Sequence, residues 1–281
     1  TQQTTAPGST FKLVMAAAGL TEGVITPSTQ INDTGAFERL DYFLRCWIYP
    51  SAHGLETVTT AIRDSCNTFF CEVGYRLSLI GDTFNEQTGL SQIQKYAEMF
   101  GLGDKTGLEI AEMQSKIADE YPVSASIGQS NNNYTTVALA RYVAAVANEG
   151  TVYDLTLLDK VTDSEGNTLE SYEPEVKNTI SEVSSNTWSL IKQGMRMVVE
   201  DHEQFNDLQV SLSGKTGTAQ EDEERPNHAL FIGFAPSDQP QIAIATRIAY
   251  GYGSGNACDF ADTVMKYYFN EASEEELLNG Q

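Results

Sequence analysis

Residues 7–20 read Pro-Gly-Ser-Thr-Phe-Lys-Leu-Val-Met-Ala-Ala-Ala-Gly-Leu, and this stretch decides the fold because two reactive side chains open a strongly apolar segment. Pro-Gly marks a turn, so a helix is predicted over residues 9–20 with Ser9 in its first turn, at the positive end of the helix dipole. Lys12 follows three residues later, which places its amine on the same helix face as the Ser9 hydroxyl. A lysine can accept a serine proton only when burial or a neighbouring cation lowers its pKa, and Lys215 is a candidate for that cation.

Two further motifs carry polar groups that could assist a reactive serine. Ser65-Cys66-Asn67 is predicted to separate helices over 55–63 and 67–77, because Ser and Asn favour caps over helix interiors. The motif supplies a hydroxyl able to relay a proton and an amide able to bind a peptide carbonyl or orient the lysine. Taken alone, it is an ordinary helix cap.

Lys215-Thr216-Gly217-Thr218 lies in a predicted strand over 213–220. Gly217 removes the side chain that would keep a ligand away from the backbone, so the strand can bond an extended peptide edge to edge. Taken alone, this tetrapeptide is better explained as a surface strand with a solvated lysine.

The remaining pattern alternates helices and short strands. Helices are predicted over 89–100, 135–148, 186–199 and 257–269, and strands over 229–235 and 241–248. Residues 154–172 suggest a strand, a turn and a second strand, whereas the acidic tail over 271–281 is expected to fray. The sequence thus predicts an α+β fold in which a helical subdomain packs on an antiparallel sheet flanked by helices.

Composition and charge exclude several classes of function. The 281 residues carry a formal net charge of -22, which argues against a nucleic-acid partner. The longest apolar run, Leu13 to Leu20, is shorter than the roughly 20 residues that span a bilayer. Four cysteines (46, 66, 71 and 258) and three histidines (53, 202 and 228) show no metal-ligand spacing, so no metal site is predicted and no histidine is assigned to chemistry.

The order S-x-x-K, S-x-N, K-T-G resembles that of the penicillin-binding proteins and class A β-lactamases. Four longer stretches are similar to the class B penicillin-binding proteins in particular: Pro7 to Lys12, Phe100 to Gly103 with Thr106-Gly107, Ile127 to Gln129, and Lys215 to Gln220. Residues 228–236 resemble the next strand of that family. The similarity runs from about residue 6 to residue 269, nearly the whole chain.

The resemblance implies a D,D-transpeptidase that cross-links peptidoglycan stem peptides through an acyl-serine intermediate and is acylated by β-lactams. It makes Ser9 the nucleophile, Lys12 its base, and Ser65 the shuttle that hands a proton to the departing D-alanine. Asn67 would hold the substrate peptide and Lys12, while Lys215 would tune the local field.

The resemblance also assigns the oxygen-binding groups. Thr216 and Thr218, on either side of Gly217, would take the terminal carboxylate. The backbone N–H groups of Ser9 and Thr218 would form the oxyanion hole. No metal or organic cofactor is implied.

The resemblance carries expectations about setting and partners. Residues 1–281 would form one transpeptidase domain without the N-terminal strands, pedestal domain and membrane anchor of the family. That domain would act on the outer face of the cytoplasmic membrane, with a glycosyltransferase and other elongation or division proteins as partners. Two departures stand out: Ser130 replaces a glycine found in many relatives, and residues 221–227 form a predicted acidic turn after the K-T-G strand.

Four other functions share part of this pattern. A serine β-lactamase needs a base that activates water, and Glu109 and Glu112 look like scaffold rather than such a base. A β-lactam sensor tends to carry another residue in place of Asn67, and a non-catalytic cell-wall scaffold would lose Ser9 or Lys12. A D,D-carboxypeptidase has the same residues and differs only in whether water or an amine attacks.

Overall fold

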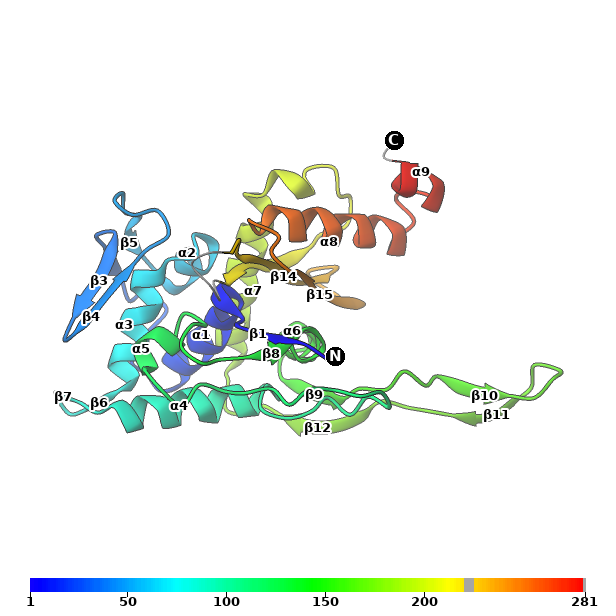
Figure 1. Ribbon diagram of the computed structural model, residues 1–281, viewed down its shortest axis with the longest axis horizontal. Helices are drawn as coiled ribbons and strands as arrows, with labels where there is room; N and C mark the ends of the chain where they lie inside the picture. Colours follow the sequence, from blue (N-terminus) through cyan, green and yellow to red (C-terminus); the bar gives the residue numbers. More distant parts are fainter. Residues whose placement is uncertain (220–224, 280–281) are drawn as a thin grey trace.

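The computed structural model describes residues 1–219 and 225–279 and confirms the predicted α+β fold (Figure 1). The helices are α1 (Lys12–Thr21), α2 (Val58–Arg63), α3 (Asn67–Leu77), α4 (Glu86–Met99), α5 (Pro122–Ala125), α6 (Thr136–Ala147), α7 (Ser185–Glu200), α8 (Gly255–Tyr268) and α9 (Glu274–Asn279), with the short 3₁₀ segments η1 (Gly8–Phe11) and η2 (Glu203–Phe205). No helix in these two ranges combines the length and apolar character needed to cross a bilayer.

An antiparallel sheet of three strands lies beside the helical part. Its order is β13 (Ser213–Ala219), β14 (His228–Ala235) and β15 (Ile242–Ile248), with Lys215 opposite Ile232 and Leu230 opposite Arg247. All three strands were predicted from sequence. Because β13 is an edge strand of this sheet, its outer edge is open to a ligand.

Both faces of the central strand are buried. Successive side chains of a strand point to opposite faces, so Leu230, Ile232 and Phe234 join the large core that includes α1, α3 and α6. Ala229, Phe231 and Ala235 instead pack with α8, whose inward residues Ala257, Cys258, Ala261 and Met265 complete a second cluster. Helix α8 therefore covers one face of the sheet, as Figure 1 shows, and α6 lies against the other.

Helix α1 is the centre of the helical part. Its residues from Leu13 to Ala18 are fully buried, and it contacts α3, α4 and α7. A helix apolar all round is one enclosed by other elements. The first turn of α1, and with it Lys12, is thereby fixed in the interior.

Small two-stranded sheets surround this core. The strands are β1 (Thr4–Thr5) with β8 (Tyr134–Thr135), β2 (Ile31–Asp33) with β5 (Gly54–Glu56), β3 (Ala36–Arg39) with β4 (Tyr42–Arg45), β6 (Leu79–Ile80) with β7 (Thr83–Phe84), β9 (Thr151–Asp154) with β12 (Glu175–Thr179), and β10 (Lys160–Thr162) with β11 (Thr168–Ser171). The last pair is the predicted strand–turn–strand, and it extends from the body as a long arm (Figure 1).

Several predicted elements differ in the structure. The helix predicted over 89–100 begins at Glu86, and the one predicted over 9–20 is a 3₁₀ turn up to Phe11 and an α-helix from Lys12. The helix expected over 55–63 begins only at Val58, because Thr57 caps it while residues 54–56 pair with β2 as strand β5. The tail expected to fray contains α9, since Ser273 and Glu276 bond each other's backbone N–H groups in a capping box. Gln220 and residues 221–224 of the predicted acidic turn lie outside the described residues.

Candidate active site

Ser9 lies in η1, the 3₁₀ turn that leads directly into α1. The turn is pressed between two other segments. The Gly8 N–H donates to the Gly128 carbonyl at 3.1 Å, and a Cβ on Gly8 would lie only 2.4 Å from the Thr218 carbonyl oxygen. Ser9 itself is half-buried, so its hydroxyl is held in place by the backbone yet remains accessible.

Gly128 gives a testable measure of this close packing. It has φ +74°, and a Cβ there would lie 2.0 Å from the Gly8 carbonyl oxygen. Gly128→Ala is expected to lower the melting temperature and to slow acylation of Ser9, since the turn that holds the nucleophile must move. Gly166→Ala is the matched control, because Gly166 has φ +89° but open space around it.

The control should lose only the roughly 1–2 kcal/mol that a left-handed conformation costs a residue with a side chain. Thermal unfolding and penicillin-labelling rates of the two variants measure the difference. Equal losses of stability and unchanged labelling in both would contradict the close contact.

Lys12 lies in the interior behind Ser9, with no exposed surface. Its ammonium donates to the Ser65 carbonyl oxygen at 2.7 Å, the Ser65 hydroxyl at 3.2 Å and the Asn67 Oδ1 at 2.7 Å. Burial lowers the pKa of Lys12 from 10.5 to about 8. The fold thus joins the first two motifs and provides the lowered pKa that a lysine base requires.

Ser65 and Asn67 occupy the predicted corner between α2 and α3. Ser65 adopts a left-handed conformation with φ +52°, and Cys66 is the N-cap of α3. Asn67 donates through Nδ2 to the Arg45 carbonyl at 3.0 Å, which leaves its Oδ1 aimed at Lys12. This conformation turns the Ser65 side chain, the Ser65 carbonyl and the Asn67 side chain toward one point.

Strand β13 brings the third motif to the same place. Lys215 is fully buried, and its ammonium donates to the Thr216 carbonyl oxygen at 3.1 Å. Burial, and then the positive charge of Lys12, hold the pKa of Lys215 well below its usual range. The electrostatic effect thus runs from Lys12 to Lys215, whereas the pKa of Lys12 itself is lowered by burial.

Gly217 allows β13 to approach the nucleophile. A Cβ at this position would lie 2.8 Å from Cγ2 of Thr10 and 3.1 Å from the Pro7 carbonyl oxygen. The exposed Thr218 and the half-buried Thr216 flank it on the open edge of the sheet.

A cavity of about 540 Å³ opens over these residues. Of the predicted site residues, those that line it are Ser9, Ser65, Asn67, Thr216, Gly217 and Thr218. Lys12 and Lys215 lie behind this surface. The structure therefore brings all the predicted residues together, with the hydroxyl and amide groups facing the cavity and the two amines beneath it.

The cavity wall also contains residues that sequence reasoning missed. Trp47 is 69% exposed, and its Nε1 donates to the Asp64 carbonyl at 2.8 Å. Arg63 contacts Asp64 and Asp201. Burial, and then Lys215, lower the pKa of His202. These side chains come from separate loops and helix ends, so no local pattern in the sequence could have grouped them.

Other sequence expectations concern residues beside the site. Ser130 takes a left-handed conformation, φ +62°, with its hydroxyl bonded to the Glu120 carbonyl. Glu112 accepts from Thr106, and Glu109 accepts from Thr156 and the Leu157 N–H. Neither glutamate is among the residues that line the cavity over Ser9.

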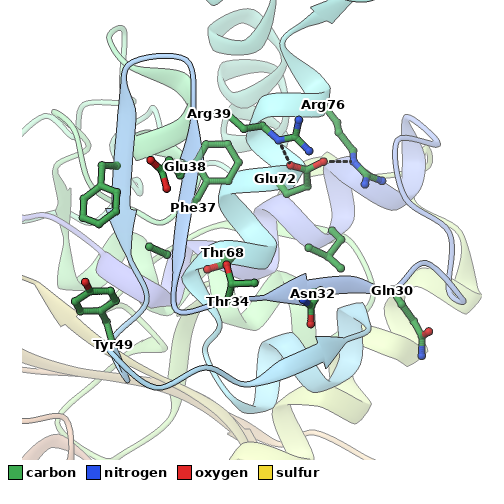
Figure 2. A pocket seen from close by; sticks show the side chains of 13 residues that line it. Gln30, Asn32, Thr34, Phe37, Glu38, Arg39, Tyr49, Thr68, Glu72 and Arg76 are labelled. Atoms are coloured by element: carbon green, nitrogen blue, oxygen red, sulfur yellow. Dashed lines mark hydrogen bonds and ion pairs between the residues drawn. The ribbon is translucent and has the colours of Figure 1, made fainter.

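A larger cavity, about 670 Å³, lies against the β3–β4 hairpin and α3 (Figure 2). At its edge Glu72 forms ion pairs with both Arg39 and Arg76. None of the three motifs lines it. The smaller cavity over Ser9 is therefore the candidate active site.

A second polar cluster lies beneath the S-C-N motif and was not predicted. Asp33, Cys46, His53 and Cys66 place their carboxylate, thiol and imidazole groups within 4.8 Å of one another. These residues are separated by six or more positions in the sequence, which is why the search for short metal-ligand spacings missed them.

Known proteins share both the sequence and the fold of this chain. The family model described as "Penicillin binding protein transpeptidase domain" matches residues 1–266. Peptidoglycan D,D-transpeptidase MrdA of Haemophilus influenzae is 29% identical over 96% of this chain and 45% of its own length. The chain thus spans about half the length of this curated relative.

Two solved structures resemble the chain closely. Pseudomonas aeruginosa PBP2 in complex with WCK 5153 is 26% identical, with a TM-score of 0.79 over 95% of this chain and 61% of its own. A chain solved in a study of how a peptidoglycan synthase complex coordinates polymerization and crosslinking is also 26% identical, with a TM-score of 0.79 over 97% of this chain and 48% of its own. These matches, together with the three motifs around one cavity, establish that the chain belongs to the penicillin-binding protein transpeptidase family, as its resemblance to the class B members indicated.

Proposed function

We propose that this chain is a D,D-transpeptidase domain that cross-links peptidoglycan stem peptides through an acyl-enzyme on Ser9. The observation that carries the proposal is the buried Lys12 ammonium, which bonds Ser65 and Asn67 directly behind the cavity that Ser9 lines. Serine, lysine, second hydroxyl and amide are the parts that serine acylation needs. The MrdA relative, itself a peptidoglycan D,D-transpeptidase, supports the same reaction for this chain.

Acylation follows from the positions of these groups. The neutral amine of Lys12 takes the hydroxyl proton of Ser9, and Ser9 Oγ attacks the carbonyl carbon of the penultimate D-alanine. The N–H groups of Ser9 and Thr218 stabilise the oxyanion. Ser65 passes a proton to the nitrogen of the departing D-alanine, whose carboxylate Thr216 and Thr218 bind.

The second half of the reaction transfers the acyl group. An amine of a second stem peptide loses its proton to the Lys12–Ser65 pair and attacks the ester carbonyl. Ser9 leaves with a proton, and a new peptide bond joins the stems. Asn67 holds the donor peptide during both steps, and Lys215 tunes the local field.

The lowered pKa of Lys12 predicts a pH dependence for acylation. Only the neutral amine can accept the proton, and with a pKa of about 8 about a tenth of it is neutral at pH 7. The second-order acylation rate should therefore rise about tenfold per pH unit below pH 8 and level off above it. Stopped-flow measurements with a chromogenic β-lactam between pH 6 and 9.5 test this, and a flat profile would exclude Lys12 as the base.

The setting of the reaction is part of the proposal. We expect the domain to act at the outer face of the cytoplasmic membrane, where stem peptides are joined. The synthase complex that contains a similar chain supports a glycosyltransferase and other elongation or division proteins as partners. Residues 1–281 would act there as one transpeptidase domain.

Incubation with a stem pentapeptide donor and an amine acceptor tests the activity itself. We expect release of D-alanine together with a donor–acceptor product, both resolved by mass spectrometry. Release of D-alanine with only the hydrolysed donor would instead identify a carboxypeptidase. Absence of both products in a chain that penicillin still labels would overturn the transpeptidase assignment.

A further inference from the structure

One part of the cavity over Ser9 is lined by side chains to which the proposed reaction assigns no role. These are Trp47, Arg63, Asp64, Asp201 and His202. The carboxylate of the donor peptide already has Thr216 and Thr218 as its binding groups, so the donor does not need a further cation. The charged groups in this part of the cavity are therefore available to a second ligand.

The packing of α2 on α7 brings the charges together. Arg63 is the last residue of α2, and Asp201 is the C-cap of α7. The two helices approach closely because Gly194 has no side chain: a Cβ there would lie 2.8 Å from Cβ of Ile62 and 3.0 Å from the Thr59 carbonyl oxygen. The two helix ends consequently meet, and Nε of Arg63 lies 3.7 Å from Oδ2 of Asp201.

The guanidinium of Arg63 keeps one edge open. Its Nε and Nη2 atoms donate to the Asp64 carboxylate at 2.6 and 2.8 Å, whereas Nη1 bonds no residue that the structure describes. The Arg63 side chain is 32% exposed. Because a guanidinium can bind a carboxylate through two parallel N–H bonds, the edge formed by Nη1 and Nη2 can take the carboxylate of a ligand.

The charges of the lining favour a ligand that carries both signs. Burial, and then the charge of Lys215, lower the pKa of His202, so its imidazole is neutral at pH 7. Among the described residues of the lining, Arg63 is then the one cation, and Asp64 and Asp201 are the two anions. The excess of negative charge attracts an ammonium group, and the guanidinium beside it binds a carboxylate.

This part of the cavity lies where an acceptor amine has to arrive. Arg63 and Asp64 directly precede Ser65, and the amine loses its proton to the Lys12–Ser65 pair, so it approaches beside Ser65. Trp47 lies here too, with its Nε1 fixed by the Asp64 carbonyl and most of its ring exposed. An indole face of this kind packs against the methylene groups of a ligand.

We propose that Trp47, Arg63 and Asp201 form an acceptor subsite, which selects an amine whose carbon also carries a carboxylate. The inference rests on the transpeptidase function proposed above and names the class of its acceptor. Arg63 binds the carboxylate, Asp201 attracts the ammonium group on entry, and Trp47 packs against the methylene chain behind it. None of the three moves a proton, so the transfer step itself is unchanged.

A competition between two acceptors tests the subsite. Nα-acetyl-lysine and mono-N-acetyl-2,6-diaminopimelate differ only in a carboxylate on the carbon of the free amine. Both are supplied at equal concentration with the stem pentapeptide donor, and the two products are counted by mass spectrometry. We expect at least about tenfold more product from the acceptor with the carboxylate, since a hydrogen bond to a charged group is worth that much. Both amines attack the same acyl-enzyme on Ser9, so this product ratio does not depend on the rate of acylation.

Substitutions separate the roles of the two charges. Arg63→Gln should bring the product ratio close to one. Arg39→Gln is the matched control, because Arg39 also pairs with a carboxylate, that of Glu72, but lines the other cavity, so its ratio should stay that of the unaltered chain. Asp201→Asn should raise severalfold the concentration of either acceptor that gives half-maximal transfer, because both acceptors carry the amine. Thermal unfolding shows whether each variant is folded, and the ratio of the unaltered chain decides the matter if Arg63→Gln is not.

The outcomes distinguish this subsite from the proposed function. Equal yields from the two acceptors in the unaltered chain, or a folded Arg63→Gln variant that keeps the ratio, would overturn the subsite while the products uphold the transpeptidase. Unchanged half-maximal concentrations in Asp201→Asn would contradict the role of that carboxylate. Release of D-alanine without product from either acceptor would overturn the transpeptidase function, and the subsite with it.

Discussion

Ser9→Ala is expected to abolish covalent attachment of penicillin to this chain. Ser9 lines the cavity and lies in the turn just before α1. The buried amine of Lys12 lies behind it. Ser65 and Thr218 also face the cavity, but neither occupies the turn held between Gly128 and β13. Removing one oxygen from a half-buried turn leaves the fold unchanged. The loss of labelling should therefore come from the missing nucleophile and not from unfolding.

Labelling with a fluorescent penicillin and denaturing electrophoresis measure this effect. Ser254→Ala is the matched control, since Ser254 lines the same cavity from the start of α8 and has no assigned role. The control should label at the rate of the unaltered chain. Any residual labelling of Ser9→Ala that maps to another serine would show that the nucleophile is misassigned.

Lys12→Ala is expected to slow acylation by two to four orders of magnitude, since a positioned general base contributes about 10²–10⁴-fold. The variant also leaves the Ser65 carbonyl and the Asn67 Oδ1 without their donor. Part of the decrease in acylation rate should therefore come from a displaced Ser65-Cys66-Asn67 motif. We expect the fold to persist, with a lowered melting temperature.

Lys12→Arg separates the base from the cation. Arginine keeps a positive charge and can donate to the same oxygens, but its pKa lies above 12, so it cannot accept the proton of Ser9. Acylation rates of both variants, measured beside thermal unfolding, should be low. A fast Lys12→Arg variant would mean that the charge of Lys12 matters and its basicity does not.

The motifs were visible in the sequence because each is local. Ser9 and Lys12 share one helical turn, Ser65 and Asn67 share one helix start, and residues 215–218 share one strand. The regular spacing of apolar residues also predicted α3 and the three strands of the sheet. That spacing can be seen within a short stretch of sequence.

What the sequence could not predict depends on long-range packing. Trp47 and His202 reach the cavity from segments more than 150 residues apart. Helical or strand periodicity cannot predict that these two segments lie close together. In the cluster of Asp33, Cys46, His53 and Cys66, the pairing of β2 with β5 brings Asp33 beside His53, and the two cysteines come from other segments. A helix start moved from residue 55 to Val58 for the same reason, because the pairing with β2 competed with the local helical preference.

The acyl-enzyme on Ser9 is the central claim, and the intact mass of the chain after incubation with penicillin tests it most directly. We predict a single adduct of one penicillin per chain that persists for hours and maps, after digestion, to the peptide that contains Ser9. Rapid return to the free mass with hydrolysed drug, or an adduct on any other residue, would contradict this account.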